Sequence, residues 1–323
     1  SPRRALVTLG CGSSASLASV LQLSFWWFDP GPSLTLGLLP PTMIRVATLD
    51  DAGELLDVCN SHELRVDPDF EAMPLSEIEE FLNGYEEPAH TLVLDEGGIK
   101  AVMFIQTSTP RNRVEPDFFT IGTKAQSKQL FEAGFAWLEQ NRKGFDLRTF
   151  CNKRDTELLA MFEESGLSFL RDYFKMVKDP IEKGFPLLPE GVTIEAIDLK
   201  QHSQLFHMLE TESFAGHFGY IALGQDDWIA EKLAETQLDQ RGSFVLRVKG
   251  EPAGLLLSGD GRADVNGGWV DKLGVLAKFR GQGLGKLLLQ WGIAHAADKG
   301  YQSIGLGVDT GNESGALQLY ENQ

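Results

Sequence analysis

The sequence lacks the residue patterns that mark metal sites and disulfide frameworks. Its three cysteines, Cys11, Cys59 and Cys151, are far apart and lie in no metal-ligand spacing. We expect each to be a small core residue in a reducing cytoplasm rather than a nucleophile. The six histidines show no paired ligand pattern, so the sequence predicts no metal.

Basic residues are also scarce. The chain carries 29 Lys and Arg against 46 Asp and Glu, which gives a formal net charge of −17. Because phosphate backbones are held by clustered Lys and Arg, this balance argues against a nucleic-acid partner. It is compatible with cationic amine substrates. No uninterrupted apolar span is long enough to cross a membrane, so no membrane partner is expected.

Residues 1–42 differ from the rest of the chain, with only three charged residues and a cluster of aromatic residues at 25–28. A signal peptide is a poor interpretation because the apolar run at 5–9 is too short. We interpret residues 1–42 as an extension upstream of a start at Met43, either disordered or non-native.

From Met43 onward the same order of predicted elements occurs twice, which indicates two α/β domains in tandem. The 323 residues are enough for two ordinary domains. The first domain is expected at 43–180 and the second at 192–323, with a proline-containing linker at 181–191. In the first we predict strands at 44–47, 90–94, 99–106, 118–122, 145–150 and 169–177, and helices at 50–62, 76–85, 128–140 and 155–165. In the second we predict strands at 192–197, 243–248, 254–258, 269–276 and 304–308, and helices at 201–212, 226–235, 286–297 and from 314.

The most informative stretch is 273–290, LGVLAKFRGQGLGKLLLQ, which reads as a strand, a glycine-rich turn and a helix. Its glycines allow the backbone to approach a ligand, and the N–H groups at a helix start can bind an anion such as pyrophosphate. A Walker A loop would need glycine in place of Arg280 and a hydroxyl in place of Leu287, and the dinucleotide fingerprint would need glycine in place of Lys286. Both motifs are therefore excluded.

The remaining pattern, Arg-x-x-Gly-x-Gly after Leu-Gly-Val, is similar to the acetyl-CoA signature of the GNAT (Gcn5-related) N-acetyltransferases. The resemblance covers about 43–323 and is strongest over 265–321. It implies two tandem GNAT-like domains, each a mixed, mostly antiparallel twisted sheet flanked by helices. It also implies that acetyl-CoA binds at Leu273, Gly274, Val275, Arg280, Gly281, Gln282, Gly283, Leu284 and Gly285.

A second motif follows at 308–321. In the resemblance to GNAT enzymes, Asn312 reaches the pantetheine arm and Tyr320 points at the CoA sulfur. A tyrosine hydroxyl facing a cleft can protonate a departing thiolate, which agrees with that assignment. The alternative is that Asn312 is a turn residue and Tyr320 a core aromatic.

The first half lacks both the glycine-rich loop and the tyrosine. The residues before its third helix, 123–128, contain no Gly-x-Gly, and Phe162 stands where the second half has Tyr320. We therefore expect that the first domain does not bind acetyl-CoA productively and that its role is structural.

The acceptor side is predicted from three residues. Glu212 can bind or deprotonate an ammonium group and His217 can relay its proton, although a solvated Glu and a loop His are equally good readings. Asp271 stands at every second position together with Leu273 and Val275, so we expect its side chain on the same face of the strand. It is the first candidate for the general base. A plain strand-edge Asp is the alternative.

Taken together, these features predict direct transfer of acetyl from acetyl-CoA to a primary amine of a small molecule. The plan resembles that of mycothiol synthase-like tandem GNAT enzymes, which makes a thiol-bearing pseudodisaccharide one specific acceptor. The alternatives are a non-catalytic acetyl-CoA-binding regulatory module and an inactive fragment that stops before its last strand.

Overall fold

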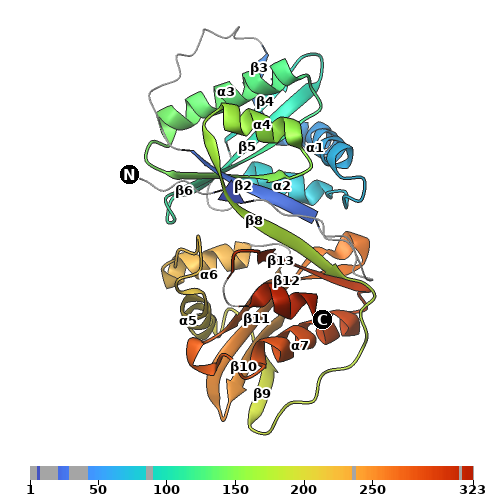
Figure 1. The fold of residues 1–323 in the computed structure, drawn as a ribbon, viewed down its shortest axis with the longest axis vertical. Coiled ribbons are helices and arrows are strands. Elements are labelled where there is room, and N and C mark those ends of the chain that lie inside the picture. Colours follow the sequence, from blue (N-terminus) through green and yellow to red (C-terminus); the bar gives the residue numbers. More distant parts are fainter. Residues whose placement is uncertain are drawn as a thin grey trace. The chain divides into compact units, whose positions relative to one another are not determined.

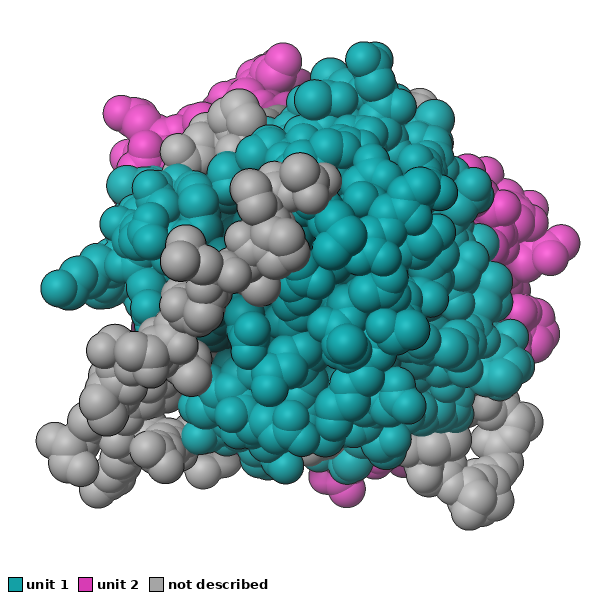
Figure 2. All heavy atoms as spheres, turned by 90° about the horizontal axis from the view of Figure 1, so that it is seen from above, with its two compact units in different colours: residues 1–11, 21–173 teal, residues 12–20, 174–323 magenta. Residues whose placement is uncertain are grey.

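The computed structural model describes residues 6–7, 21–28, 43–84, 90–234, 238–312 and 315–322. The chain divides into two compact units (Figures 1 and 2). Of the described residues, those up to Tyr173 belong to the first unit and those from Phe174 onward to the second. This division falls earlier than the predicted domain end at 180, because strand β8 begins in the first unit and its last residues join the second sheet. No helix among the described residues is long and apolar enough to span a membrane.

The first unit is built on a mostly antiparallel sheet. Neighbouring strands follow the order β3-β4-β5-β6-β7, and only β6 and β7 run parallel. Side chains alternate along β5: Met103 packs with the α3 and α4 side, and Phe104 with the α1 and α2 side. The elements are β3 (Ile44–Val46), α1 (Ala52–Val66), α2 (Leu75–Asn83), β4 (His90–Asp95), β5 (Ile99–Ser108), β6 (Arg113–Thr120), α3 (Lys124–Asn141), β7 (Asp146–Asn152), α4 (Thr156–Glu164) and β8 (Leu167–Lys178).

Two short parts of the predicted extension pair with this sheet. Strand β2 (Leu21–Phe28) runs antiparallel to β7, with Phe25 opposite Phe150. Strand β1 (Leu6–Val7) pairs with β2 and with β8. The other residues of 1–42 lie outside the described part of the chain, so the assignment of 1–42 as an extension stays a prediction.

The second unit repeats the plan in the order β9-β10-β11-β12-β13. Helices α5 and α6 pack on one face of its sheet through Phe206 and Trp228, and α7 packs on the other through Leu288 (Figure 1). The elements are β9 (Val192–Ala196), α5 (Ser203–Phe214), α6 (Gln225–Ala234), β10 (Leu238–Val248), β11 (Glu251–Arg262), β12 (Gly267–Val275), α7 (Leu284–Lys299), β13 (Ser303–Asp309) and α8 (Ala316–Glu321). Two mostly antiparallel sheets flanked by helices confirm the predicted fold class.

The far edge of the second sheet is formed by a segment from the middle of the chain. The last residues of β8, 174–178, lie beside β13. Phe174 and Met176 pack against the α7-side core of this unit. Residues that the sequence reading assigned to the first domain therefore stand where the second half was expected to lack a strand.

In each unit one parallel pair of neighbouring strands, β6 with β7 and β12 with β13, separates along its length. The paired residues are Arg113–Val114 with Asp146–Leu147 in the first unit, and Gly267–Val270 with Ser303–Leu306 in the second. Beyond these residues neither pair has further register. Each sheet therefore has a gap toward the carboxyl ends of its parallel strands, and such a gap is a usual place for ligands in sheet proteins.

Candidate active site

The predicted glycine-rich loop lies between β12 and α7. Gly281 and Gly283 have φ values of 75° and 76°, a region that strains residues with side chains. Nothing lies within 4 Å of where a Cβ would stand on either residue. Gly283 is the N-cap of α7, and no side chain caps this helix. Its first N–H groups are therefore available to an anion such as a pyrophosphate.

The other loop residues are placed differently. Gln282 is exposed, whereas the side chain of Leu284 is buried in the core of the unit. A Cβ on Gly285 would lie 3.5 Å from Leu319 Cδ2, which is an ordinary contact. Leu284 and Gly285 thus contribute backbone N–H groups rather than side chains.

Strand β12 presents backbone groups to the gap. The N–H of Leu276 donates to Ala253 O at 2.9 Å, so Leu276 and Gly274 face β11. Leu273 and Val275, at alternate positions, direct their N–H groups to the opposite edge. No described strand pairs with that edge beyond Val270.

Gly274 is required by the close approach of α5. A Cβ at this position would lie 2.7 Å from the Cβ of Ser213, in the last turn of that helix. The end of α5 is therefore packed directly on the strand that carries the open edge.

Asp271 does not lie where its alternation predicted. Leu257 is opposite Lys272 and Ser258 is opposite Val270, which leaves Asp271 as the extra residue of a β-bulge. Its carboxylate lies 3.6 Å from the Nζ of Lys232 on α6.

The prediction that Asp271 shares a face with Leu273 and Val275 was wrong, because those two residues pack on the α7 side and the bulge shifts the alternation. Burial raises the pKa of Asp271, but Lys272 and Lys232 together hold it below its usual value. The side chain is therefore a carboxylate at neutral pH.

The predicted acceptor residues lie at the end of α5 and just after it. Glu212 is exposed on the last turn, and the His217 ring packs 5.1 Å from the ring of Phe214. Burial, and then the charge of Arg280, lower the pKa of His217, while Asp309 at the end of β13 raises it by less. His217 is therefore a neutral imidazole with charged groups from both sides of the gap around it, and it can accept a proton.

Arg280 was expected at the cofactor, and its side chain lies against the protein backbone. Its Nε donates to Val275 O at 3.0 Å and its Nη2 donates to Ser213 O at 2.8 Å. The guanidinium thus connects β12 to the end of α5.

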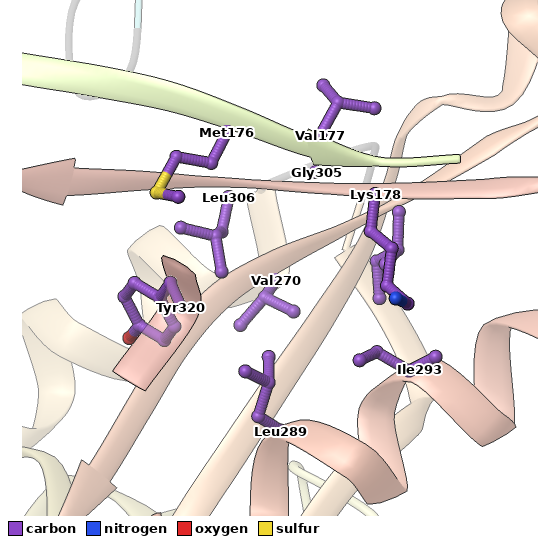
Figure 3. A pocket seen from close by; sticks show the side chains of 10 residues that line it. Met176, Val177, Lys178, Val270, Leu289, Ile293, Gly305, Leu306 and Tyr320 are labelled. Atoms are coloured by element: carbon purple, nitrogen blue, oxygen red, sulfur yellow. The ribbon is translucent and has the colours of Figure 1, made fainter. Parts of the chain in front are cut away.

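Tyr320 lies where the parallel strands part. It lines an apolar pocket together with Val270 and Leu306, which are the last registered pair of β12 and β13 (Figure 3). Burial raises the pKa of Tyr320 to about 12, so the hydroxyl keeps its proton at neutral pH. Other walls of the pocket come from β8, α7 and β13: Met176, Val177, Lys178, Leu289, Ile293, Ile304 and Gly305.

Asn312 follows β13, as the motif predicted. It is half-buried, and its backbone N–H donates to Asp309 O at 3.1 Å. The next two residues of the motif, 313 and 314, lie outside the described residues. Within the described ranges, no group of His, Cys, Asp and Glu side chains is arranged to hold a metal ion.

Two residues of the site were missed by the sequence reading. Lys232 is 3% exposed although it is a lysine, and Ser213 is 2% exposed with a hydroxyl that has no hydrogen-bond partner. Lys232 follows the buried Trp228 by four residues, so it shares the inner face of α6, and that spacing was a usable signal. Nothing local marks Ser213.

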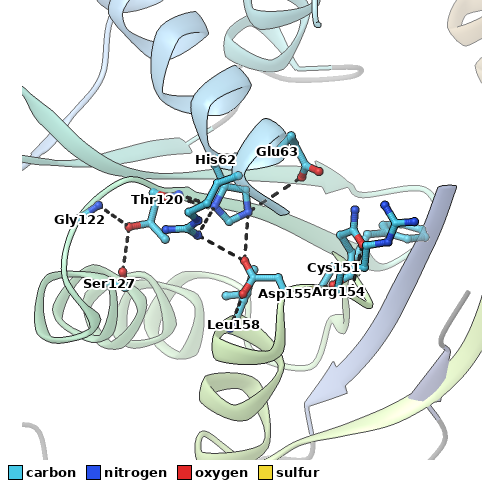
Figure 4. A network of polar contacts seen from close by, with 12 residues as sticks. His62, Glu63, Thr120, Gly122, Ser127, Cys151, Arg154, Asp155 and Leu158 are labelled. Atoms are coloured by element: carbon cyan, nitrogen blue, oxygen red, sulfur yellow. Dashed lines mark hydrogen bonds and ion pairs between the residues drawn. The ribbon is translucent and has the colours of Figure 1, made fainter. Parts of the chain in front are cut away.

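The corresponding region of the first unit is built differently. The N-cap of helix α3 is Thr123, whose hydroxyl accepts from the N–H of Gln126, and the Gln126 side chain accepts from the N–H of Thr123. Beside the gap, the His62 Nδ1 lies 3.0 Å from Thr120 O, and its Nε2 lies 3.4 Å from Asp155 Oδ2 (Figure 4). Phe162, aligned with Tyr320, is fully buried. At this helix start, side chains of the unit thus satisfy backbone N–H groups that an anion would otherwise contact.

Known proteins match part of the chain in sequence and both units in fold. Residues 194–323 match the acetyltransferase (GNAT) family. The mycothiol acetyltransferase of Streptomyces griseus is 28% identical over 180 residues, which are 55% of this chain and 58% of that protein. The mycothiol acetyltransferase of Streptomyces scabiei is 32% identical over 183 residues, with the same two coverages of 55% and 58%. The chain thus matches little more than half the length of these curated relatives.

Solved structures extend the likeness to both units. A GCN5-related N-acetyltransferase from Sphaerobacter thermophilus has a TM-score of 0.73 at 18% identity, covering 88% of this chain and 92% of that one. A tandem GNAT protein from the clavulanic acid biosynthesis pathway has a TM-score of 0.62 at 14% identity, covering 86% and 94%. At these identities the likeness concerns the fold alone.

Proposed function

Because residues 194–323 match the model of the acetyltransferase (GNAT) family, we propose that the second unit transfers an acetyl group from acetyl-CoA to a primary amine of a small molecule. The observation that carries this proposal is the uncapped, glycine-rich start of α7 beside the open edge of β12. The helix start can bind a pyrophosphate, and the open strand edge can bind the extended pantetheine arm. Their combination is what a CoA thioester requires.

In this proposal the backbone N–H groups of the loop 281–285 bind the pyrophosphate. The N–H groups of Leu273 and Val275 meet the pantetheine arm and the thioester carbonyl, and Asn312 reaches the arm from the other side of the gap. Acetyl-CoA supplies an activated acetyl group. A fixed N–H aimed at the carbonyl stabilises the negative charge that develops during transfer.

Proton transfer is assigned to residues on the two sides of the gap. Asp271, which Lys232 keeps ionised, suits binding of the acceptor ammonium better than removal of its proton. The neutral His217 is the better base, with the exposed Glu212 acting through water. Tyr320 keeps its proton and can give it to the departing thiolate.

The acceptor is proposed to be a small cationic amine. Two acidic side chains, Glu212 and Asp271, come from the elements that border the acceptor side. The names of the curated relatives make the amine acetylated in mycothiol formation the first compound to test. We place the reaction in a reducing cytoplasm, since Cys59 and Cys151 are buried and free.

We propose that the first unit binds no acetyl-CoA and has a structural role. Its helix start is capped by its own side chains, and its gap is bordered by the His62 ring, whose pKa burial lowers, and by the Asp155 carboxylate. The cap occupies the backbone N–H groups that an anion would need.

A thiol-release assay with acetyl-CoA and a panel of amines tests the proposal. We expect CoA release that depends on the amine, with kinetics that show both substrates bound at once. Ping-pong kinetics with an acetylated enzyme would contradict direct transfer. Tight acetyl-CoA binding by calorimetry without release for any amine would instead support a regulatory binding module.

A further inference from the structure

The guanidinium of Arg280 donates hydrogen bonds to two backbone carbonyls that belong to different parts of the proposed site. Val275 O lies on the open edge of β12 and accepts from Nε at 3.0 Å. Ser213 O lies in the last turn of α5 and accepts from Nη2 at 2.8 Å. The guanidinium holds its donors in a fixed geometry, so it sets the separation of the two carbonyls.

Each of these carbonyls is one that ordinary secondary structure leaves without a partner. The last carbonyls of a helix have no partner within that helix, and a cation near them is favoured by the helix dipole. Val275 is on the edge of β12 that no described strand joins. Arg280 thus compensates two exposed backbone acceptors at once, which accounts for the inward turn of a residue on an exposed loop.

The connection falls at the closest contact between the two elements. Ser213 approaches Gly274 so closely that an added Cβ would be 2.7 Å away. Ser213 is flanked by Glu212, and the loop after α5 carries His217. A shift at the end of α5 would therefore move the acceptor-side groups relative to the thioester-binding edge.

We propose that Arg280 is a positioning residue, which joins the acceptor end of α5 to the acetyl-CoA edge of β12 through its two carbonyl contacts, and that its side chain is not a pyrophosphate ligand. The inference rests on the proposed function. It assigns to the first residue of the glycine-rich motif a role in aligning the amine with the thioester.

The test compares Arg280→Lys, Arg280→Gln and the control Lys278→Gln in the full chain. Lysine keeps the charge but cannot span both carbonyls, whereas glutamine loses both properties. Lys278 lies on the same loop and pairs instead with Glu251, so its substitution removes an equal charge from the loop without breaking the connection. Thermal unfolding verifies that each variant is folded.

We expect both Arg280 variants to lower kcat/KM for the amine by roughly 10 to 10²-fold, the size of effect that a misplacement of about 1 Å produces. Acetyl-CoA affinity, measured by calorimetry, should stay close to that of the parent protein in all three variants. A loss of acetyl-CoA affinity in Arg280→Gln that Arg280→Lys restores would overturn the proposal, since that pattern belongs to a pyrophosphate ligand.

The pH dependence of kcat/KM gives a second test, because a purely structural role of Arg280 would leave it unchanged. The charges facing His217 are Arg280, which lowers its pKa, and Asp309, which raises it. Removing the cation in Arg280→Gln should shift the acid limb of kcat/KM to higher pH, whereas Arg280→Lys should leave the limb near its original place. An unchanged limb in Arg280→Gln would contradict the placement of the Arg280 charge next to His217.

A chain that releases no CoA with any amine would contradict the proposed function but would still allow the connection to be tested. Amide hydrogen exchange at the end of α5 should be faster in both Arg280 variants and unchanged in Lys278→Gln. Equal exchange in all the proteins would refute the positioning role by itself.

Discussion

The two units differ in how the N-terminus of one helix is capped, α3 in the first unit and α7 in the second. In the first, the α3 start is closed by the reciprocal hydrogen bonds of Thr123 and Gln126. In the second, the α7 start at Gly283 has no side-chain cap. Capping and anion binding use the same backbone N–H groups, so one helix start cannot do both. The first helix start is thus closed by its own side chains, whereas the second leaves the N–H groups that the proposed pyrophosphate site needs.

The gaps between the parallel strands show the same contrast. In the first unit the ring of His62 and the carboxylate of Asp155 lie beside the gap, with Arg65 Nη2 3.6 Å from Asp155 (Figure 4). Next to them Glu63 is buried, with one carboxylate oxygen that has no hydrogen-bond partner. In the second unit the groups at the gap are backbone N–H groups, a neutral His217 and a protonated Tyr320. The first gap is thus bordered by buried titratable side chains, and the second by backbone N–H groups that no described strand pairs with.

The strongest way to break the comparison is to block the open helix start. Gly283→Val should abolish acetyl-CoA binding, because a β-branched side chain strains the left-handed backbone and occupies the ligand's approach. Calorimetry should show one acetyl-CoA per chain in the parent protein. Gly250→Val is the matched control, since Gly250 has a similar φ of 84° and open space in the hairpin between β10 and β11. Two molecules bound per chain would show that the first unit is not empty.

The next largest effect is expected at the position where the units differ in a hydroxyl, Tyr320 against Phe162. Tyr320→Phe should lower kcat about 10² to 10⁴-fold, the range for one positioned acid, and leave acetyl-CoA affinity almost unchanged. Tyr301→Phe removes a hydroxyl that donates to Asp260 at 2.8 Å and should leave kcat unaltered. A Tyr320→Phe enzyme as fast as the parent would remove this residue from the mechanism.

The buried carboxyl of the first unit predicts a pH-dependent stability. Burial raises the pKa of Glu63 to about 7 from its ordinary 4.5. The folded protein therefore binds this proton more tightly than the unfolded chain, and the associated stability is lost as the pH rises from about 4.5 to about 7.

Glu63→Gln should remove that loss, worth on the order of 2 kcal/mol at pH 8, in urea unfolding compared at pH 5 and pH 8. The measured quantity is the difference between variant and parent, because His62, whose pKa burial lowers, gives the opposite slope below about pH 6.5. Glu157→Gln, an exposed change on α4, should behave like the parent. A parallel pH dependence in Glu63→Gln and the parent would show that Glu63 is ionised in the folded protein.

The smallest expected effect is at the closed helix start. Thr123→Ala should lower stability by about 1 kcal/mol, the usual cost of losing an N-cap side chain. Acetyl-CoA stoichiometry should stay at one per chain, because uncapping α3 does not supply the glycines and the open strand edge. A second binding event in this variant would mean that the cap alone separates the two units.

Features that depend on neighbouring residues were predicted from the sequence. The glycine-rich turn before α7 and the helix that carries Tyr320 were predicted close to where they form, because backbone freedom and helix start are local properties. The prediction for strand β6 was only partly right, because the strand begins at Arg113 and not at Phe118. Its first part contains Glu115, Pro116 and Asp117, which are unfavourable in strands. Acidic residues and proline are uncommon in strands, so local preference argued against the structure that formed.

The sequence by itself determined the order of elements, the repeated plan and the position of the glycine-rich turn, since these follow from spacing, glycine content and periodicity. Only the tertiary structure decided that Asp271 turns to Lys232, that Arg280 spans Val275 and Ser213, and that the end of β8 borders the second sheet. Each of these depends on a contact between distant segments. A bulge in β12 reverses the side-chain alternation at Asp271. The guanidinium of Arg280 binds the carbonyls that packing brings within reach. Neither outcome can be predicted from the neighbouring residues in the sequence.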